Sequence, residues 1–191
     1  MSEVSEPIAV TLLVIDALES LHIPYVIGGS LASALHGVAR ATLDSDLVVD
    51  LQPGHVKPLV QALQEAFYVD EMAVRQAIER QSSFNLIHLE TIFKVDLFIA
   101  GQQPFTQAQI RNAQAVVVAT DPERTARFSS AEDTILAKLR WYRLGGDSSE
   151  RQWRDVTGII TAQAARLDWS YLQQGAAELG VADLLVRLQE D

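Results

Sequence analysis

The chain lacks cysteine altogether over its 191 residues. Without thiols there is no disulfide framework, no thiol nucleophile and no thiolate metal site. No apolar run approaches the ~20 residues that are needed to cross a bilayer, so we expect no membrane contact. The first ten residues, MSEVSEPIAV, are acidic and lack the basic start of a secretory signal. We therefore expect a cytoplasmic protein.

Positive charge is also scarce. The 15 Lys and Arg residues are outnumbered by 25 Asp and Glu residues, which leaves a formal net charge of −10. Broad non-specific binding of nucleic acid needs basic residues that displace counterions from phosphates, so this balance disfavours it. A local cluster of basic residues between Lys138 and Arg154 could still grip one RNA stem.

The rest of the composition is that of an ordinary globular protein, with 48% apolar and 21% charged residues. Hydrophobic periodicity predicts an α/β (α+β) fold, in which a mixed sheet with flanking helices is followed by a helical region. We expect an α/β core over 1–128 and a helical region over 129–191. The predicted strands are 25–27, 43–50, 84–90, 92–100 and 115–120, and the predicted helices are 6–21, 31–37, 56–66, 71–81, 130–143, 149–164 and 168–188.

A glycine pair follows the first predicted strand in the segment YVIGGSLASALHG. Gly28 and Gly29 allow backbone N–H groups to approach an anion, and the N-terminus of the next helix adds positive potential. Ser30 can cap this helix and donate a further hydrogen bond, while Gly37 should end it. The segment is thus suited to binding phosphate.

Aspartates interrupt two apolar strands, where a charge is tolerated only if it is paired or bound to metal. Asp44 and Asp46 share one face of their strand, with backbones ~6.6 Å apart, so their carboxylates can converge. Asp50 lies ~20 Å from Asp44 and is read as a residue of the strand end. Asp96 offers a third carboxylate in KVDLF. Oxygen ligands without cysteine indicate Mg²⁺ or Mn²⁺ as cofactor.

Each of these features also occurs in ordinary turns and edge strands, but their combination indicates a functional site. Their order resembles the polymerase-beta-type nucleotidyltransferase superfamily: a Gly-Gly-Ser turn, a spacer, D-x-D and a third acidic residue on a neighbouring strand. The closer likeness is to bacterial abortive-infection toxin-type nucleotidyltransferases, through RATLDSD and AEDTILAKLRWYRLGG…SERQWRDVTGII. The resemblance covers roughly residues 20–165.

The resemblance implies a role for each matching residue. Gly29 and Ser30, next to Gly28, would hold triphosphate oxygens, and Lys138 would project from its helix to touch the phosphates. The metal ligands would be Asp44, Asp46 and Asp96.

Other residues near these motifs have more than one interpretation. Arg40 and Thr42 could reach a phosphate or a base, or make only a loop contact. A solvated helix face is the other interpretation of Lys138. Asp155 could pair with Lys138 or with an arginine across a helix hairpin. His88 is expected to be a hydrogen-bonded strand residue.

These observations lead to a main hypothesis and an alternative. The main one is transfer of a nucleoside monophosphate from an NTP to a hydroxyl of tRNA or protein, within a toxin–antitoxin or phage-defence system that includes a cognate antitoxin. Asp96 would also help to deprotonate the acceptor. The alternative is a catalytically silent module that binds a nucleotide or a partner. We expect Lys138→Ala to weaken nucleotide binding while the fold survives.

Overall fold

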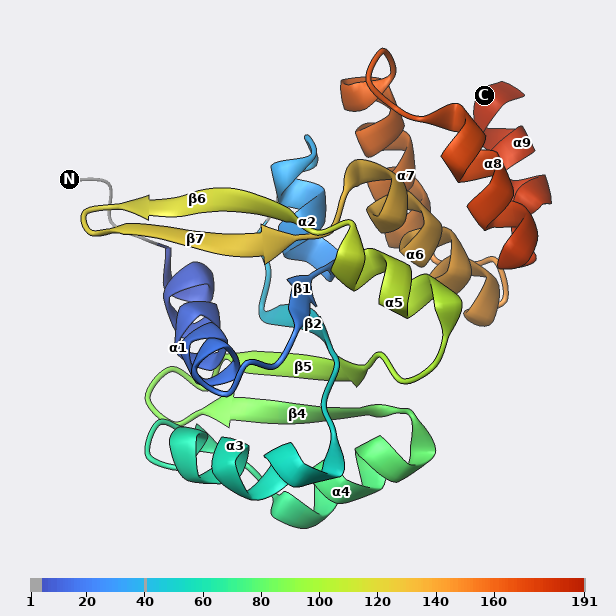
Figure 1. The fold of residues 1–191 in the computed structure, drawn as a ribbon. Coiled ribbons are helices and arrows are strands. Elements are labelled where there is room, and N and C mark those ends of the chain that lie inside the picture. The colour runs from blue at the N-terminus through green and yellow to red at the C-terminus, as the bar shows by residue number, and fades with distance from the viewer. Residues whose placement is uncertain (1–4, 40, 191) are drawn as a thin grey trace. The chain divides into compact units, whose positions relative to one another are not determined.

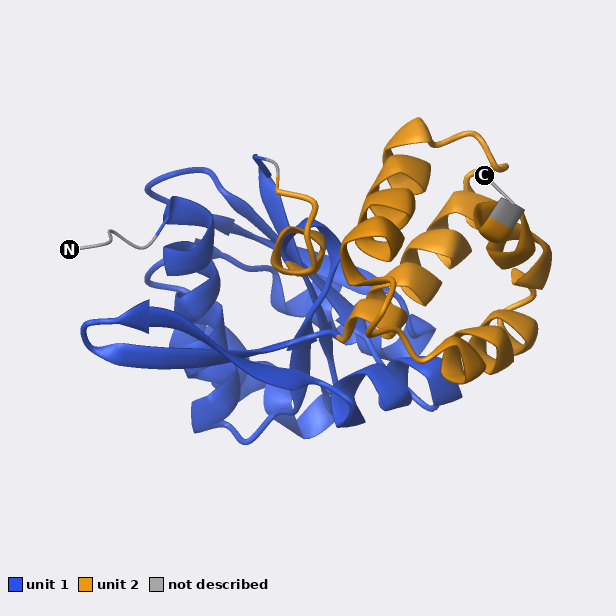
Figure 2. Ribbon diagram, turned by 90° about the horizontal axis from the view of Figure 1, so that it is seen from above, with its two compact units in different colours: residues 1–31, 41–129 blue, residues 32–40, 130–191 orange. Residues whose placement is uncertain are grey.

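The computed structural model describes residues 5–39 and 41–190 of the chain. It divides into two compact units, shown in Figure 2. The first consists of residues 1–31 and 41–129, and the second of residues 32–40 and 130–191. No helix in the described ranges is long and apolar enough to cross a membrane.

A mixed β-sheet forms the centre of the first unit (Figure 1). In the described part of the chain it has seven strands in the order β3-β4-β5-β2-β1-β7-β6. β2 and β5 are parallel, whereas β1 pairs with β2, and β4 with β5, in antiparallel fashion. The strands are β1 (Tyr25–Ile27), β2 (Asp44–Val49), β3 (Phe67–Tyr68), β4 (Ser83–His88), β5 (Lys94–Ile99), β6 (Gln114–Thr120) and β7 (Glu123–Phe128).

The two faces of β2 have opposite character. Ser45, Leu47 and Val49 are buried on one face, where α1 (Glu6–Ser20) packs and the Thr11 hydroxyl donates to Ser45 Oγ at 3.0 Å. Asp44 and Asp46 are half-buried and lie on the other face, because side chains alternate along a strand. The other helices of this unit are α3 (Val56–Leu63) with the preceding 3₁₀ turn η1 (Pro53–His55), α4 (Glu71–Arg80) and α5 (Pro104–Arg111).

The mixed α/β fold class is confirmed, and every strand that was predicted is present with small shifts at its ends. The sequence prediction missed the short strand β3, the helix α5 and the strand β7. In β7 the residues Ala126 and Phe128 are buried while Thr125 and Arg127 are exposed. This alternation was the available signal, but the strand is short and lies directly after Asp121-Pro122, which reads as a turn.

The second unit consists of helices. α2 (Gly29–Leu35) crosses the boundary between the units, since residues 32–40 belong to the second. Gly37 ends α2 as predicted, with φ +120° and a bond from Val38 N–H to Ser33 O of 2.9 Å. The remaining helices are α6 (Ala131–Leu144), α7 (Glu150–Gln163), α8 (Trp169–Glu178) and α9 (Ala182–Glu190).

The prediction of one helix over 168–188 is wrong, because the chain turns at Gly180. Gly180 adopts φ +69°, its N–H donates to Ala177 O, and the N–H of Val181 donates to Ala176 O. This is the Schellman arrangement, in which a left-handed glycine and the next N–H satisfy the last carbonyls of a helix. The apolar pattern continues across the turn, and Val181 is fully buried. The periodicity therefore hid the break.

Candidate active site

The glycine turn packs directly on the carboxylate of Asp46. The N–H of Gly28 donates to Asp46 O at 2.8 Å, and Gly29 has φ +54°, in the left-handed region that favours glycine. A Cβ built on Gly29 would overlap the carboxylate, at 2.6 Å from Asp46 Cγ. The absence of a side chain at Gly29 is thus what lets Asp46 lie against the turn.

Ser30 lies two positions further into the helix than the sequence suggested, since it is the second residue of α2. α2 begins at Gly29, so Ser30 is inside its first turn instead of capping it. Its side chain is buried, at 4% exposure. The capping prediction is therefore wrong, because the helix begins at Gly29, two residues before the predicted start at Leu31. Binding of phosphate by Gly28, Gly29 and Ser30 stays a prediction.

The parallel register of β2 and β5 brings two of the aspartates side by side. Asp46 is paired with Asp96, and Asp44 with Lys94. Adjacent strands lie ~4.8 Å apart, and paired residues point to the same face. All three carboxylates of the predicted set therefore occupy one face of the sheet. Strand pairing thus places Asp96 beside Asp46, which lies 50 residues earlier in the chain (96 − 46).

Thr42 contacts Asp44 from the loop that precedes β2. Its hydroxyl lies 2.8 Å from Asp44 O and 3.1 Å from Asp44 Oδ1, so it donates its proton to that residue. This is the loop contact that the sequence left open, and it orients the first aspartate. A nucleotide contact by Thr42 stays a prediction. The companion prediction for Arg40 lies outside the described residues.

Lys94 is a site residue that the sequence reasoning did not select. Its Nζ lies 2.7 Å from Asp96 Oδ2. The hydrogen bond to Asp96 raises the pKa of Lys94, and the charges of Asp96, Asp44 and Asp46 raise that pKa further. The available signal was the spacing K-V-D, which puts Lys94 on the same face as Asp96.

Within residues 5–39 and 41–190, no three acidic or histidine side chains are grouped closely enough to hold a metal ion. The donors on this face nevertheless fit a hard divalent cation, because they are carboxylates and two of them are register partners. The ammonium group bound to Asp96 shows that this face accommodates positive charge.

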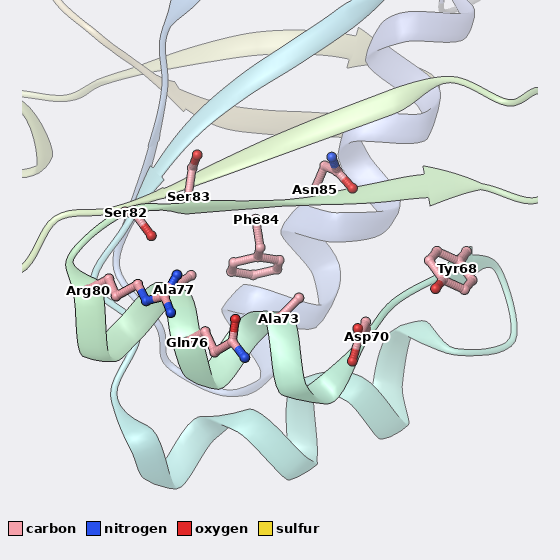
Figure 3. A pocket seen from close by; sticks show the side chains of 10 residues that line it. All are labelled: Tyr68, Asp70, Ala73, Gln76, Ala77, Arg80, Ser82, Ser83, Phe84 and Asn85. Atoms are coloured by element: carbon pink, nitrogen blue, oxygen red, sulfur yellow. The ribbon is translucent and has the colours of Figure 1, made fainter.

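A pocket of about 400 Å³ opens between α4 and the outer edge of β4 (Figure 3). β3 pairs with Ile87 and His88 of β4, and among the residues that the structure describes no strand lies beside the earlier part of this edge. None of the three aspartates lines the pocket, but Asn85 does, and Asn85 is the register partner of Asp96. The lining residues are Tyr68, Asp70, Ala73, Gln76, Ala77, Arg80, Ser82, Ser83, Phe84 and Asn85.

Lys138 is not on a solvated helix face. Its side chain is only 6% exposed, and its Nζ lies 2.7 Å from Asp155 Oδ2 and 3.2 Å from Gln152 Oε1. An ion pair of Asp155 across α6 and α7 is therefore confirmed, with Lys138 and not an arginine as the partner, whereas the expectation that Lys138 lies on the surface is wrong. Amphipathic spacing could not reveal this, because the partner lies on another helix. Contact of Lys138 with a nucleotide stays a prediction.

Two other sequence interpretations are confirmed. His88 is buried in β4, and its Nδ1 lies 2.9 Å from Thr91 Oγ1. Asp50 follows the end of β2 and accepts from Gln52 Nε2 at 2.9 Å. Both residues have structural partners of their own, so neither needs a part in the site.

No family model and no curated protein sequence matches the chain. Solved structures do match, and they share the nucleotidyltransferase type of fold. One is ANT(2'')-Ia in complex with adenylyl-2''-tobramycin, with 14% identity, a TM-score of 0.60, and coverage of 92% of this chain and 97% of that one. Another is the lincomycin-bound lincosamide antibiotic adenylyltransferase LnuA, with 18% identity, a TM-score of 0.52, and coverage of 83% and 98%.

A third similar structure is an antigenic nucleotidyltransferase-like protein from Paracoccidioides brasiliensis. It has 19% identity and a TM-score of 0.54, and the match covers 94% of this chain and 91% of that chain. At such identities the shared property is the fold. The fold of this chain is thus a mixed α/β fold of nucleotidyltransferase type with a helical C-terminal region.

Proposed function

We propose that the chain is a nucleotidyltransferase that moves a nucleoside monophosphate from an NTP to an acceptor hydroxyl. The observation that carries the proposal is the contact of Asp46 with the Gly29 turn on one side and its register pairing with Asp96 on the other. A turn suited to phosphate and two strand carboxylates are thereby neighbours. The fold shared with two antibiotic-modifying enzymes, ANT(2'')-Ia and LnuA, supports this assignment.

In the proposed reaction the acceptor oxygen attacks the α-phosphorus of the NTP. A new P–O bond forms to the acceptor, the bond from the α-phosphorus to its bridging oxygen breaks, and pyrophosphate leaves with that electron pair. Asp96 accepts the proton of the acceptor hydroxyl. The turn formed by Gly28, Gly29 and Ser30 binds triphosphate oxygens through backbone N–H groups and the Ser30 hydroxyl.

Asp44, Asp46 and Asp96 would hold Mg²⁺ or Mn²⁺ in this proposal. When bound, such ions supply Lewis-acid neutralisation of charge on phosphate oxygens. Thr42 would keep Asp44 oriented through the bond to its carboxylate. For Asp96 Oδ2 itself to ligate an ion or to accept a proton, it has to be released from Lys94.

The acceptor defines the biological role. The sequence resemblance favours tRNA or a protein, with a cognate antitoxin as a further partner in a cytoplasmic defence system. Two of the similar structures instead contain small antibiotics: ANT(2'')-Ia holds adenylyl-2''-tobramycin, and LnuA holds lincomycin. Both kinds of acceptor present hydroxyl groups, so the test has to include both.

The purified chain is incubated with Mg²⁺ and each α-labelled NTP, in one series with cellular RNA and protein and in another with hydroxylated antibiotics. We expect label to enter one acceptor class with stoichiometric release of pyrophosphate. Asp46→Asn keeps the shape of the side chain but removes its charge, and it should lower labelling by about a hundredfold or more. Loss of a residue that only hydrogen-bonds to a metal ligand already lowers metal affinity or activity by about 10–100-fold. Asp50→Asn, at the end of the same strand, is the matched control and should label normally. Equal labelling by Asp46→Asn and the parent would contradict the mechanism.

A second candidate function is nucleotide binding without turnover. The observation in its favour is the ion pair of Lys94 with Asp96, which engages the proposed base. Calorimetric titration with each NTP and Mg²⁺, followed by a pyrophosphate assay, separates the two functions. Binding without pyrophosphate release in the presence of every acceptor would favour the silent module.

A further inference from the structure

Lys94 brings a positive charge to the carboxylate face. It lies two residues before Asp96 on β5, and its register partner on β2 is Asp44. Its Nζ is 2.7 Å from Asp96 Oδ2, the distance of a charge-assisted hydrogen bond. We propose that Lys94 competes with a divalent cation for the carboxylate of Asp96 and so limits how tightly the nucleotide-free chain binds metal.

The inference rests on the proposed function, because it takes Asp96 to be a metal ligand. Its physical basis is that one carboxylate oxygen cannot accept a close ammonium group and ligate a cation at full strength at the same time. Both are positive charges that seek the same lone pairs. A metal that takes Asp96 Oδ2 has to displace the ammonium group, and a metal held by Oδ1 alone is repelled by the nearby ammonium charge. Either effect lowers the apparent affinity.

Exposure decides whether the ammonium group can be displaced. The side chain of Lys94 is 42% exposed and that of Asp96 19% exposed. Lys94 can therefore turn into water without leaving a buried charge behind, because its flexible stem carries the head group to solvent. A fully buried pair would be a fixed structural element, and this pair is not one.

The competition predicts two effects of opposite sign. Without metal, Lys94 offsets repulsion among Asp44, Asp46 and Asp96, so its removal should destabilise the chain. With metal, its removal should increase binding, because the competitor is gone. An ion pair with a structural role alone predicts only the first effect and leaves the metal affinity unchanged.

The experiment measures Mn²⁺ binding to the full-length, nucleotide-free chain by titration calorimetry and by the loss of the free Mn²⁺ signal in electron paramagnetic resonance. Lys94→Met should bind Mn²⁺ about fivefold more tightly, the factor that corresponds to the upper range of exposed ion pairs. Lys94→Arg keeps the charge and should stay close to the parent. Lys57→Met removes an exposed positive charge from α3 and should leave Mn²⁺ affinity unchanged.

Thermal melting provides the second readout. Lys94→Met should melt below the parent without metal, and Mn²⁺ should raise its melting temperature by more than it raises that of the parent. If Lys94→Met is unfolded without metal, the inference requires that Mn²⁺ restores its folding, and absence of this rescue overturns the inference. Lys94→Gln, which keeps a polar group, should show the same sign of change.

Failure of the inference and failure of the proposed function give different results. If the parent binds Mn²⁺ in a manner that Asp46→Asn weakens, and Lys94→Met binds no more tightly than the parent, then the competition is wrong and the proposed function stands. If the parent binds no Mn²⁺ that depends on Asp46, the proposed metal site is wrong, and the competition at Asp96 is wrong with it.

Discussion

Gly28 and Gly29 are neighbours in the chain, but a methyl group would meet different surroundings at each. At Gly28 the nearest atom to an added Cβ is Asp46 O, at 3.9 Å, which is an ordinary contact. At Gly29 the added Cβ would overlap the Asp46 carboxylate, and the backbone has φ +54°. The turn therefore needs glycine at position 29 to keep Asp46 in place. This requirement is independent of any role of Gly28 in binding phosphate.

Gly29→Ala should lower the free energy of unfolding by at least about 1–2 kcal/mol, the cost of a left-handed conformation for a residue with a Cβ. It should also weaken Asp46-dependent Mn²⁺ binding, because the carboxylate has to move. Gly28→Ala is the matched control and should change the free energy of unfolding by less than about 0.5 kcal/mol. Urea denaturation and Mn²⁺ titration measure the two effects. Equal loss in both variants would show that the overlap at Asp46 is not the cause.

The helix pair α6 and α7 contains a buried ion pair between Lys138 and Asp155, which are 5% and 1% exposed. Taking two charges out of water is costly, so such a pair is weak evidence of added stability. Loss of one partner is a different matter, since it leaves the other charge buried and uncompensated. A Lys138→Ala variant is thus no clean probe of nucleotide contact.

Lys138→Ala should lower the free energy of unfolding by about 3–5 kcal/mol, the range seen when one member of a buried pair is removed. The double variant Lys138→Met with Asp155→Leu removes both charges and should recover much of that loss. Arg143→Ala, at an exposed ion pair with Asp147 and Asp183, is the control and should melt close to the parent. A Lys138→Ala variant as stable as the parent would show that the pair is dispensable.

Across the whole molecule, the division into two units does not follow chain order. Residues 32–40 come directly after the glycine turn but belong with 130–191. Gln163 Nε2 donates to His36 O at 3.3 Å, and a Cβ on Gly158 would lie 2.6 Å from Val38 Cγ2. The segment that follows the proposed phosphate site is thereby packed by α7.

Gly158→Leu should disturb this packing. Overfilling a packed site costs ~1–3 kcal/mol or more, against ~1 kcal/mol gained from better helix propensity. We expect a lower melting temperature and faster amide hydrogen exchange over residues 32–38. Adding Val38→Ala makes room and should restore part of both. Unchanged exchange in the single variant would show that residues 32–40 do not depend on α7.

Local pattern was sufficient wherever the cause of a structure lies within a few residues. The alternation in β2 predicted that Asp44 and Asp46 share a face, and Gly37 was recognised as the end of α2. Local pattern was insufficient where a turn signal and a periodic pattern fall on the same or adjacent residues. At Gly180 the apolar period runs through a left-handed turn, and in β7 a proline turn stands before a short alternating strand.

The sequence by itself therefore determined the mixed α/β fold class, the common face of Asp44 and Asp46, and the glycine turn before them. Backbone dihedrals and side-chain periodicity are local properties, and they can be read from adjacent residues. Only the tertiary structure decided that Asp96 lies beside Asp46, that Lys94 occupies the Asp96 carboxylate, and that Lys138 is buried against Asp155. These pairings depend on strand register and helix packing between distant segments, which the local pattern of either segment does not specify.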